Sequence, residues 1–186
     1  MKRFSAFASL VAALALLVTT GITSAQQQRQ QGGEPKDLVG KPAPAFSLKT
    51  FSGETVKLAD QKGKVVLIDF WATWCPPCRE SLPHVQKLSD DKEMAEKGLV
   101  VWAVNAREGK DKIEPFMTQN NYSFSVPMDA NGATMNKYHV RGIPTTIVVG
   151  RDGKVKNAFV GFGGEQSAKQ IHDAVVAALA ESEPAA

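Results

Sequence analysis

The hydrophobic residues of this chain fall into uninterrupted runs and periodic stretches. Two largely apolar runs, at 65–70 and 99–104, have the length of single strands and predict strands buried on both faces. Apolar residues at three- and four-residue spacing predict helices after Cys78, over 110–120 and over 165–180. Pro83 lies inside the first of these helices and is expected to kink it.

Shorter patterns complete the chain. Turn-forming residues at 51–54 separate two extended segments and predict an N-terminal β-hairpin. A short strand over 124–128, a short helix over 133–138 and a hairpin turn at 151–154 leading into a strand at 155–160 follow later. Strands and helices that first alternate and then end as a hairpin and a helix predict an α/β fold, with a mixed central sheet flanked by helices.

The N-terminal residues have a composition of their own. Residues 1–25 have the pattern of a secretory signal peptide, in which Lys2 and Arg3 precede an uncharged apolar stretch and small residues lead up to Ala25. An uncleaved membrane anchor is the alternative, although the apolar stretch is short for a complete span. Residues 26–37 are rich in glutamine and are predicted to be a disordered linker, and 182–186 a flexible tail. Residues 38–181 then form one domain.

The net charge and the predicted export limit the classes of partner that this protein can have. Removal of Lys2 and Arg3 with the signal peptide lowers the formal net charge from +3 to +1. A nearly neutral chain does not suit nucleic acid or an anionic membrane as its main partner. Export places the domain in the periplasm or another extracytoplasmic space, where thiols are oxidised unless another protein keeps them reduced.

Cys75 and Cys78 are the only cysteines of the chain, and two prolines separate them. They lie between a buried strand and the first turn of a helix, which is the arrangement of a redox-active pair. Free N–H groups and the helix dipole at that N-terminus stabilise a thiolate on Cys75. We therefore expect Cys75 to attack and Cys78, one turn further on, to resolve the mixed disulfide.

Two other interpretations of the cysteine pair are weaker. A structural disulfide that closes so short a loop removes little entropy from the unfolded chain. A zinc site needs four ligands, usually at regular spacing, and His84, His139 and His172 show none. We expect no bound metal and no cofactor.

The motifs resemble those of the thioredoxin superfamily, and within it the exported TlpA/ResA-like thiol-disulfide oxidoreductases. The resemblance covers residues 38–181 and rests on Gly-Lys-Pro-Ala-Pro-x-Phe at 40–46, Trp-Cys-x-x-Cys at 74–78, Gly-Ile-Pro-Thr at 142–145 and the spacing between them. It implies a thioredoxin fold. Because the 65 residues between Cys78 and Pro144 exceed those of a plain thioredoxin, it also implies a central insertion at about 107–130.

The resemblance assigns roles around the cysteines. Pro144, which the residues alone leave as an edge-strand proline or a cis peptide in a turn, matches the cis-proline that faces the redox pair. Ile143 is implied to offer its backbone to an extended substrate segment. Trp74 is implied to shield the sulfurs, and Pro76 and Pro77 complete the implied substrate-binding region.

Asp69 is the one charged residue in the run 65–70, at the position where thioredoxin has a buried carboxylate. Burial is expected to raise its pKa and to suit it to accept the proton of Cys78, although a buried Asp that only hydrogen-bonds to local backbone is the alternative. Many relatives have Glu three residues after the second cysteine, where this chain has Ser81. Glu80 lies about 100° around the helix and is expected at the surface, so Asp69 takes over the acid chemistry.

The expected function is that of a thiol-disulfide oxidoreductase acting on protein partners. The resemblance implies a monomeric reductant, for example of apocytochrome c thiols, that a membrane electron donor reduces again. A thiol peroxidase is the first alternative, but it needs a hydroxyl residue and a proline where this chain has Ala72 and Ile68. A copper-binding protein of similar fold is the second, and it would separate its cysteines by three residues rather than two.

Overall fold

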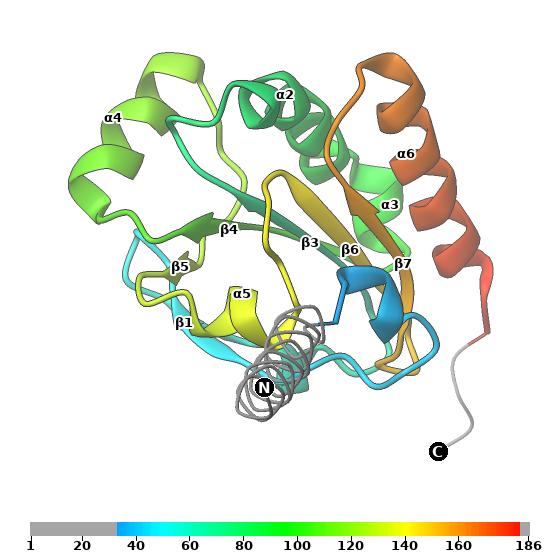
Figure 1. The fold of residues 1–186 in the computed structure, drawn as a ribbon. Coiled ribbons are helices and arrows are strands. Elements are labelled where there is room, and N and C mark those ends of the chain that lie inside the picture. Colours follow the sequence, from blue (N-terminus) through cyan, green and yellow to red (C-terminus); the bar gives the residue numbers. More distant parts are fainter. Residues whose placement is uncertain (1–32, 183–186) are drawn as a thin grey trace, which may run out of the picture. The chain divides into compact units, whose positions relative to one another are not determined.

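Strand β3 (Val65–Trp71) is the centre of the fold, and all seven of its residues are buried. In the computed structural model, which describes residues 33–182, β3 is the middle strand of a five-stranded sheet of order β5-β4-β3-β6-β7 (Figure 1). It pairs in parallel with β4 and antiparallel with β6. Strand β5 runs parallel to β4, and β7 antiparallel to β6. The sheet is therefore mixed, as the sequence predicts.

The described helices and strands have the following bounds in chain order: η1 (Pro35–Leu38), β1 (Ser47–Lys49), β2 (Thr55–Lys57), η2 (Leu58–Gln61), β3 (Val65–Trp71), α2 (Pro76–Asp90), α3 (Lys92–Glu96), β4 (Leu99–Ala106), α4 (Lys110–Asn120), β5 (Met128–Asp129), α5 (Ala133–Lys137), β6 (Thr145–Val149), β7 (Val155–Val160) and α6 (Glu165–Ala180). Within residues 33–182, no helix combines the length and the apolar composition needed to cross a membrane.

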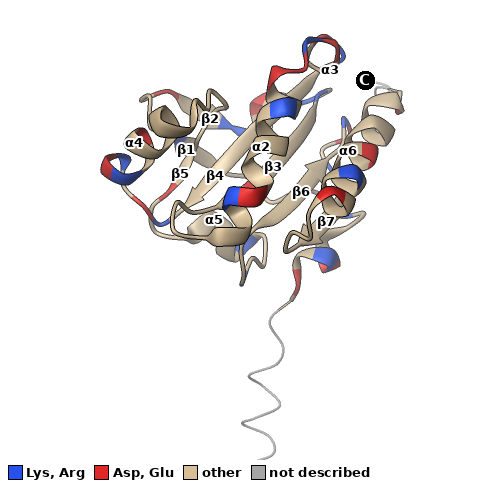
Figure 2. Ribbon diagram, turned by 90° about the horizontal axis from the view of Figure 1, so that it is seen from above, with Lys and Arg blue, Asp and Glu red and all other residues tan. Residues whose placement is uncertain are grey.

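Successive side chains of β3 point to opposite faces of the sheet. Both faces are covered, because an apolar cluster packs on each of them. Leu67 and Trp71 belong to an apolar cluster with the buried residues of α2, α4 and α6. These three helices lie on the same side of the sheet (Figure 1), and Figure 2 marks the positions of their charged residues along the ribbon. Ile68 and Phe70 belong to a second cluster, which includes Phe46 from the N-terminal segment and residues next to α5.

The N-terminal hairpin and several long elements agree with the sequence predictions. Strands β1 and β2 pair antiparallel as a separate two-stranded sheet. Helices α4 and α6 and strand β7 have the predicted bounds. The segment 107–130, where the insertion is expected, contains α4 and the edge strand β5.

Three expectations need correction. The strand expected over 124–128 is only Met128–Asp129, because Pro127 has no N–H to donate and interrupts the pairing with β4. The short helix α3 was not expected; it begins where Asp91 accepts a hydrogen bond from the backbone N–H of Met94. Ordered structure also begins earlier than predicted, since Pro35 and Leu38 of η1 are buried.

That last correction removes residues 34–37 from the predicted disordered linker. The predicted signal peptide (1–25), the rest of the linker up to residue 32 and most of the predicted tail (183–186) lie outside the described residues.

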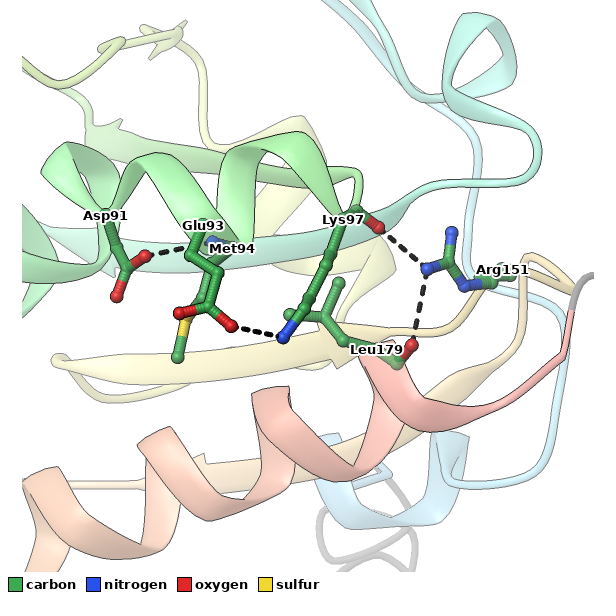
Figure 3. Close-up of polar contacts among 6 residues, drawn as sticks. All are labelled: Asp91, Glu93, Met94, Lys97, Arg151 and Leu179. Carbon is green, nitrogen blue, oxygen red and sulfur yellow. Dashed lines mark hydrogen bonds and ion pairs between the residues drawn. The ribbon is translucent and has the colours of Figure 1, made fainter.

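Arg151 lies at the end of the sheet opposite the cysteines, and Figure 3 shows its contacts with Lys97 and Leu179. It follows β6, whose Val149 pairs with Val66 at the start of β3, whereas Cys75 follows the end of β3. Its guanidinium donates to the carbonyl oxygens of Gly63 (2.7 Å), Lys97 (2.7 Å) and Leu179 (3.3 Å). Arg151 thus ties the turn after β6 to the ends of α3 and α6.

We predict that Arg151→Met lowers the free energy of unfolding by roughly 2–4 kcal/mol, because three carbonyl groups lose a charged donor. Chemical denaturation measures the change. The control Lys154→Met removes a charge from the exposed part of the same turn and should change stability by less than about 0.5 kcal/mol. An Arg151 variant as stable as this control would contradict the structural role.

Candidate functional site

The chain passes from β3 into α2 through a short turn that presents Cys75. Cys75 is the N-cap of α2, and its Sγ accepts a hydrogen bond of 3.3 Å from the backbone N–H of Cys78. Pro76 occupies the first helical position, where a missing N–H costs nothing. Cys75 and Cys78 form a disulfide with an S–S distance of 2.06 Å. Cys78 is fully buried, whereas Cys75 reaches the surface of a groove.

Pro144 lies beside this disulfide. The Ile143–Pro144 peptide bond is cis, and Pro144 immediately precedes β6, the antiparallel neighbour of β3. The Sγ of Cys75 is 3.6 Å from the carbonyl oxygen of Ile143. In the disulfide this is a contact without a hydrogen bond, because the sulfur has no proton, but a reduced thiol has an acceptor within reach.

A groove of about 780 Å³ opens at this point. Four of the five residues predicted to bind substrate line it together with Cys75, namely Trp74, Pro76, Pro77 and Ile143. The fifth, Pro144, is buried behind them. Trp74 is 67% exposed, so the groove offers a partner a large aromatic surface next to the sulfur.

Asp69 lies under the active-site helix, fully buried on the face of β3 that packs against α2. The hydroxyl of Thr146 donates a hydrogen bond of 2.7 Å to its Oδ1, and Oδ2 has no hydrogen-bond partner within residues 33–182. Burial raises the pKa of Asp69 from 3.8 to about 7, and the Thr146 hydrogen bond offsets part of that rise. The carboxyl group therefore changes its protonation close to neutral pH.

A cleft of about 260 Å³ between α2 and α6 reaches this carboxyl group. Ser81, His84, Thr146 and His172 are among its lining residues, and a cleft of this size can hold water. The cleft thus leaves room for water close to Asp69, on the side of the sheet that α2 and α6 cover. This cleft is separate from the groove that exposes Cys75.

The structure places the remaining candidates as follows. Ser81 is buried, and its hydroxyl donates a hydrogen bond of 2.9 Å to the carbonyl oxygen of Cys78. The position at which many relatives have Glu thus holds a neutral side chain here. Glu80 is exposed, as predicted. Pro83 lies inside α2, on its exposed side. No group of three His, Cys, Asp or Glu side chains within the described residues could hold a metal ion.

Glu108 is a site residue that the sequence analysis missed. Its carboxylate accepts hydrogen bonds from the backbone N–H of Thr73 (2.8 Å), from the Thr73 hydroxyl (2.6 Å) and from the Asn105 side chain (2.8 Å). Thr73 lies in the turn that presents Cys75, so Glu108 holds this turn against the end of β4. An available signal was polar Asn105 at the end of a buried apolar run, with Glu108 three residues later, because the ends of parallel strands meet at one edge.

We predict that Asp69→Asn changes how stability depends on pH. The buried carboxyl group keeps its proton up to about pH 7, whereas in the unfolded chain it ionises near 3.8. Its contribution to stability is therefore complete below pH 3.8 and is lost as the pH rises towards 7. The variant should gain roughly 3–5 kcal/mol relative to the wild type between about pH 4 and pH 8.

Denaturant unfolding of the oxidised proteins at several pH values measures this gain. Asp60→Asn, which changes an exposed carboxylate in η2, is the matched control and should show no such trend. If the difference in unfolding free energy between the wild type and Asp69→Asn did not change with pH, the raised pKa of Asp69 would be contradicted.

We also predict that Glu108→Gln loosens the active-site turn. The amide keeps the size of the carboxylate but loses charge and one acceptor, which should lower the free energy of unfolding by about 1–3 kcal/mol and slow thiol exchange. Glu96→Gln, an exposed surface change, is the control. Equal exchange rates in the two variants would show that the Glu108 contacts do not hold the turn in its active form.

Comparisons with known proteins agree with this arrangement. The model of the AhpC/TSA family matches residues 39–158. The thioredoxin-like protein YneN of Bacillus subtilis is 42% identical over 137 residues, which cover 72% of this chain and 78% of YneN. The thiol-disulfide oxidoreductase ResA of Bacillus thuringiensis subsp. konkukian is 34% identical over 140 residues, 75% of this chain and 78% of ResA.

A solved structure matches as well. It is that of a Chlorobium tepidum protein provisionally assigned as the thiol:disulfide interchange protein DsbE, with a TM-score of 0.70 and 37% identity over 76% of this chain and 97% of that one. The fold, the cysteine pair at the start of α2 and these relatives agree. The chain therefore belongs to the AhpC/TSA family of thioredoxin-like proteins and is a thiol-disulfide oxidoreductase of the ResA/DsbE type.

Proposed function

We propose that this protein is an extracytoplasmic reductant that transfers electrons from the Cys75–Cys78 pair to disulfides in other proteins. One observation supports it above all. Cys75 lines an open groove beside Ile143 and the cis-Pro144, whereas Cys78 is buried behind it. Only one of the two sulfurs is thus placed to meet a partner. The signal-peptide pattern of residues 1–25 supports the extracytoplasmic location.

The reaction follows from these positions. In the reduced protein, the Cys75 thiolate attacks one sulfur of the substrate disulfide, so that a Cys75–substrate disulfide forms and the other substrate sulfur leaves as a thiolate. Cys78 then gives its proton to the carboxylate of Asp69 and attacks the Sγ of Cys75. The second substrate sulfur is released, and Cys75 and Cys78 form the disulfide seen in the structure. Two electrons have passed to the substrate.

Asp69 suits the proton transfer because its pKa of about 7 lets it gain and lose a proton near neutral pH. The cleft between α2 and α6 gives that proton a way to solvent. We propose oxidised apocytochrome c as a substrate and a membrane protein as the donor that reduces the pair again. The support for this direction is the resemblance to the exported TlpA/ResA-like branch.

A thiol peroxidase is less well supported. The positions three and seven residues before Cys75 are Ala72 and Ile68, which are buried and have no hydroxyl group for a peroxide. The hydroxyl of Thr73 is nearest in sequence, and it donates to Glu108. A protein substrate therefore fits the site better than a peroxide.

The test uses a peptide that contains Cys-x-x-Cys-His as an internal disulfide, the type of sequence to which c-type haem is attached. Reduced Cys78→Ser should accumulate a mixed disulfide with this peptide, because Cys75 attacks and nothing resolves the product. Cys75→Ser should accumulate none. Mass spectrometry identifies the adduct. Trapping by Cys75→Ser instead would reverse the assigned roles, and rapid turnover of hydrogen peroxide by the wild type would favour the peroxidase.

A further inference from the structure

The groove next to Cys75 contains charge of only one sign. Of its lining residues, Arg107 and Arg141 are the ones that carry charge, and none of the others is acidic. Both arginines are exposed, and neither forms an ion pair within residues 33–182. The adjacent acid, Glu108, is turned towards Thr73 and Asn105 and does not line the groove. The two positive charges there are thus not neutralised by the groove itself.

The two arginines come from opposite sides of the reactive sulfur. Arg107 follows β4 and Arg141 precedes β6, and these strands flank β3 on its two sides. Cys75 follows the end of β3 between them (Figure 1). The rest of the lining is mostly apolar: Trp74, Pro76, Pro77, Ala106, Val140 and Ile143. A segment bound over Cys75 therefore meets a mostly apolar groove whose charged lining residues are two arginines.

The side chain of Arg107 lies against the backbone at Gly132. The residue has a left-handed conformation (φ 63°), and its guanidinium lies against Gly132 at the start of α5. A Cβ at position 132 would be 2.9 Å from the guanidinium carbon of Arg107, so a larger residue there would displace the side chain.

We infer that this groove selects polypeptide segments with acidic residues close to the reactive cysteine. Guanidinium groups bind carboxylates through paired, charge-assisted hydrogen bonds, and two of them at one groove also attract an acidic partner from a distance. The inference rests on the proposed function, because it names the class of protein disulfide that the Cys75–Cys78 pair reduces. The exchange step is the one described above, and the arginines contribute binding and not electron transfer.

The test compares three synthetic peptides with the same internal disulfide, flanked by Glu, Gln or Lys. The rate constant for their reduction by the purified, reduced protein is followed by release of peptide thiols. At about 20 mM salt we expect the Glu peptide to react about tenfold faster than the Lys peptide, because attraction and repulsion both contribute. At about 500 mM salt the ratio should fall below about threefold, since screening shortens the reach of the charges.

The variant Arg107→Gln/Arg141→Gln should bring the ratio of Glu to Lys peptide close to one. Lys49→Gln/Lys57→Gln, which removes two exposed charges from the N-terminal hairpin, should keep the wild-type ratio. Thermal unfolding of each variant checks that the fold is intact.

The outcomes separate the two proposals. If the wild type reduces none of the peptides, the proposed function fails. If it reduces all three at equal rates in low salt, the function stands and the selectivity is wrong. A preference for the Glu peptide that survives the loss of both arginines would also overturn the inference.

Discussion

The contact between the start of α2 and the Sγ of Cys75 is the interaction on which the site depends. The backbone N–H of Cys78 donates to this sulfur at 3.3 Å, so the end of the helix with free donors and positive dipole charge faces the atom that must carry negative charge during exchange. The contact forms because buried β3 delivers Cys75 to the helix N-cap. The pairing of β3 with β6 then sets this sulfur beside Pro144, which immediately precedes β6.

Two carboxylates support this sulfur in different ways. Asp69 is buried beneath α2 and titrates near neutral pH, which suits it to move a proton. Glu108 binds three donors and fixes the turn before Cys75, which suits it to position the sulfur. The groove on the other side of the disulfide has only the positive charges of Arg107 and Arg141. In the proposed reaction, proton transfer and partner binding thus use separate sides of the start of α2.

Local patterns were sufficient to predict much of this arrangement. The buried run of β3, the apolar stripe of α6 and the cysteine motif each depend on residues close together in sequence, and the resemblance added the cis-Pro144. Glu108 was missed because its contact with Thr73 joins residues 35 positions apart. The two arginines were missed for the same reason. The strand predicted over 124–128 was too long. Its apolar residues are buried, but Pro127 prevents regular strand pairing there.

The most direct test of the account is a redox titration of the purified protein in dithiothreitol buffers of graded potential, with alkylated thiols counted by mass and the fold followed by circular dichroism. We expect both thiols to appear together in one two-electron step near the potential of thioredoxin, about −270 mV, with the fold retained. A pair that stays oxidised throughout, or whose reduction unfolds the domain, would mark the disulfide as structural and contradict the account.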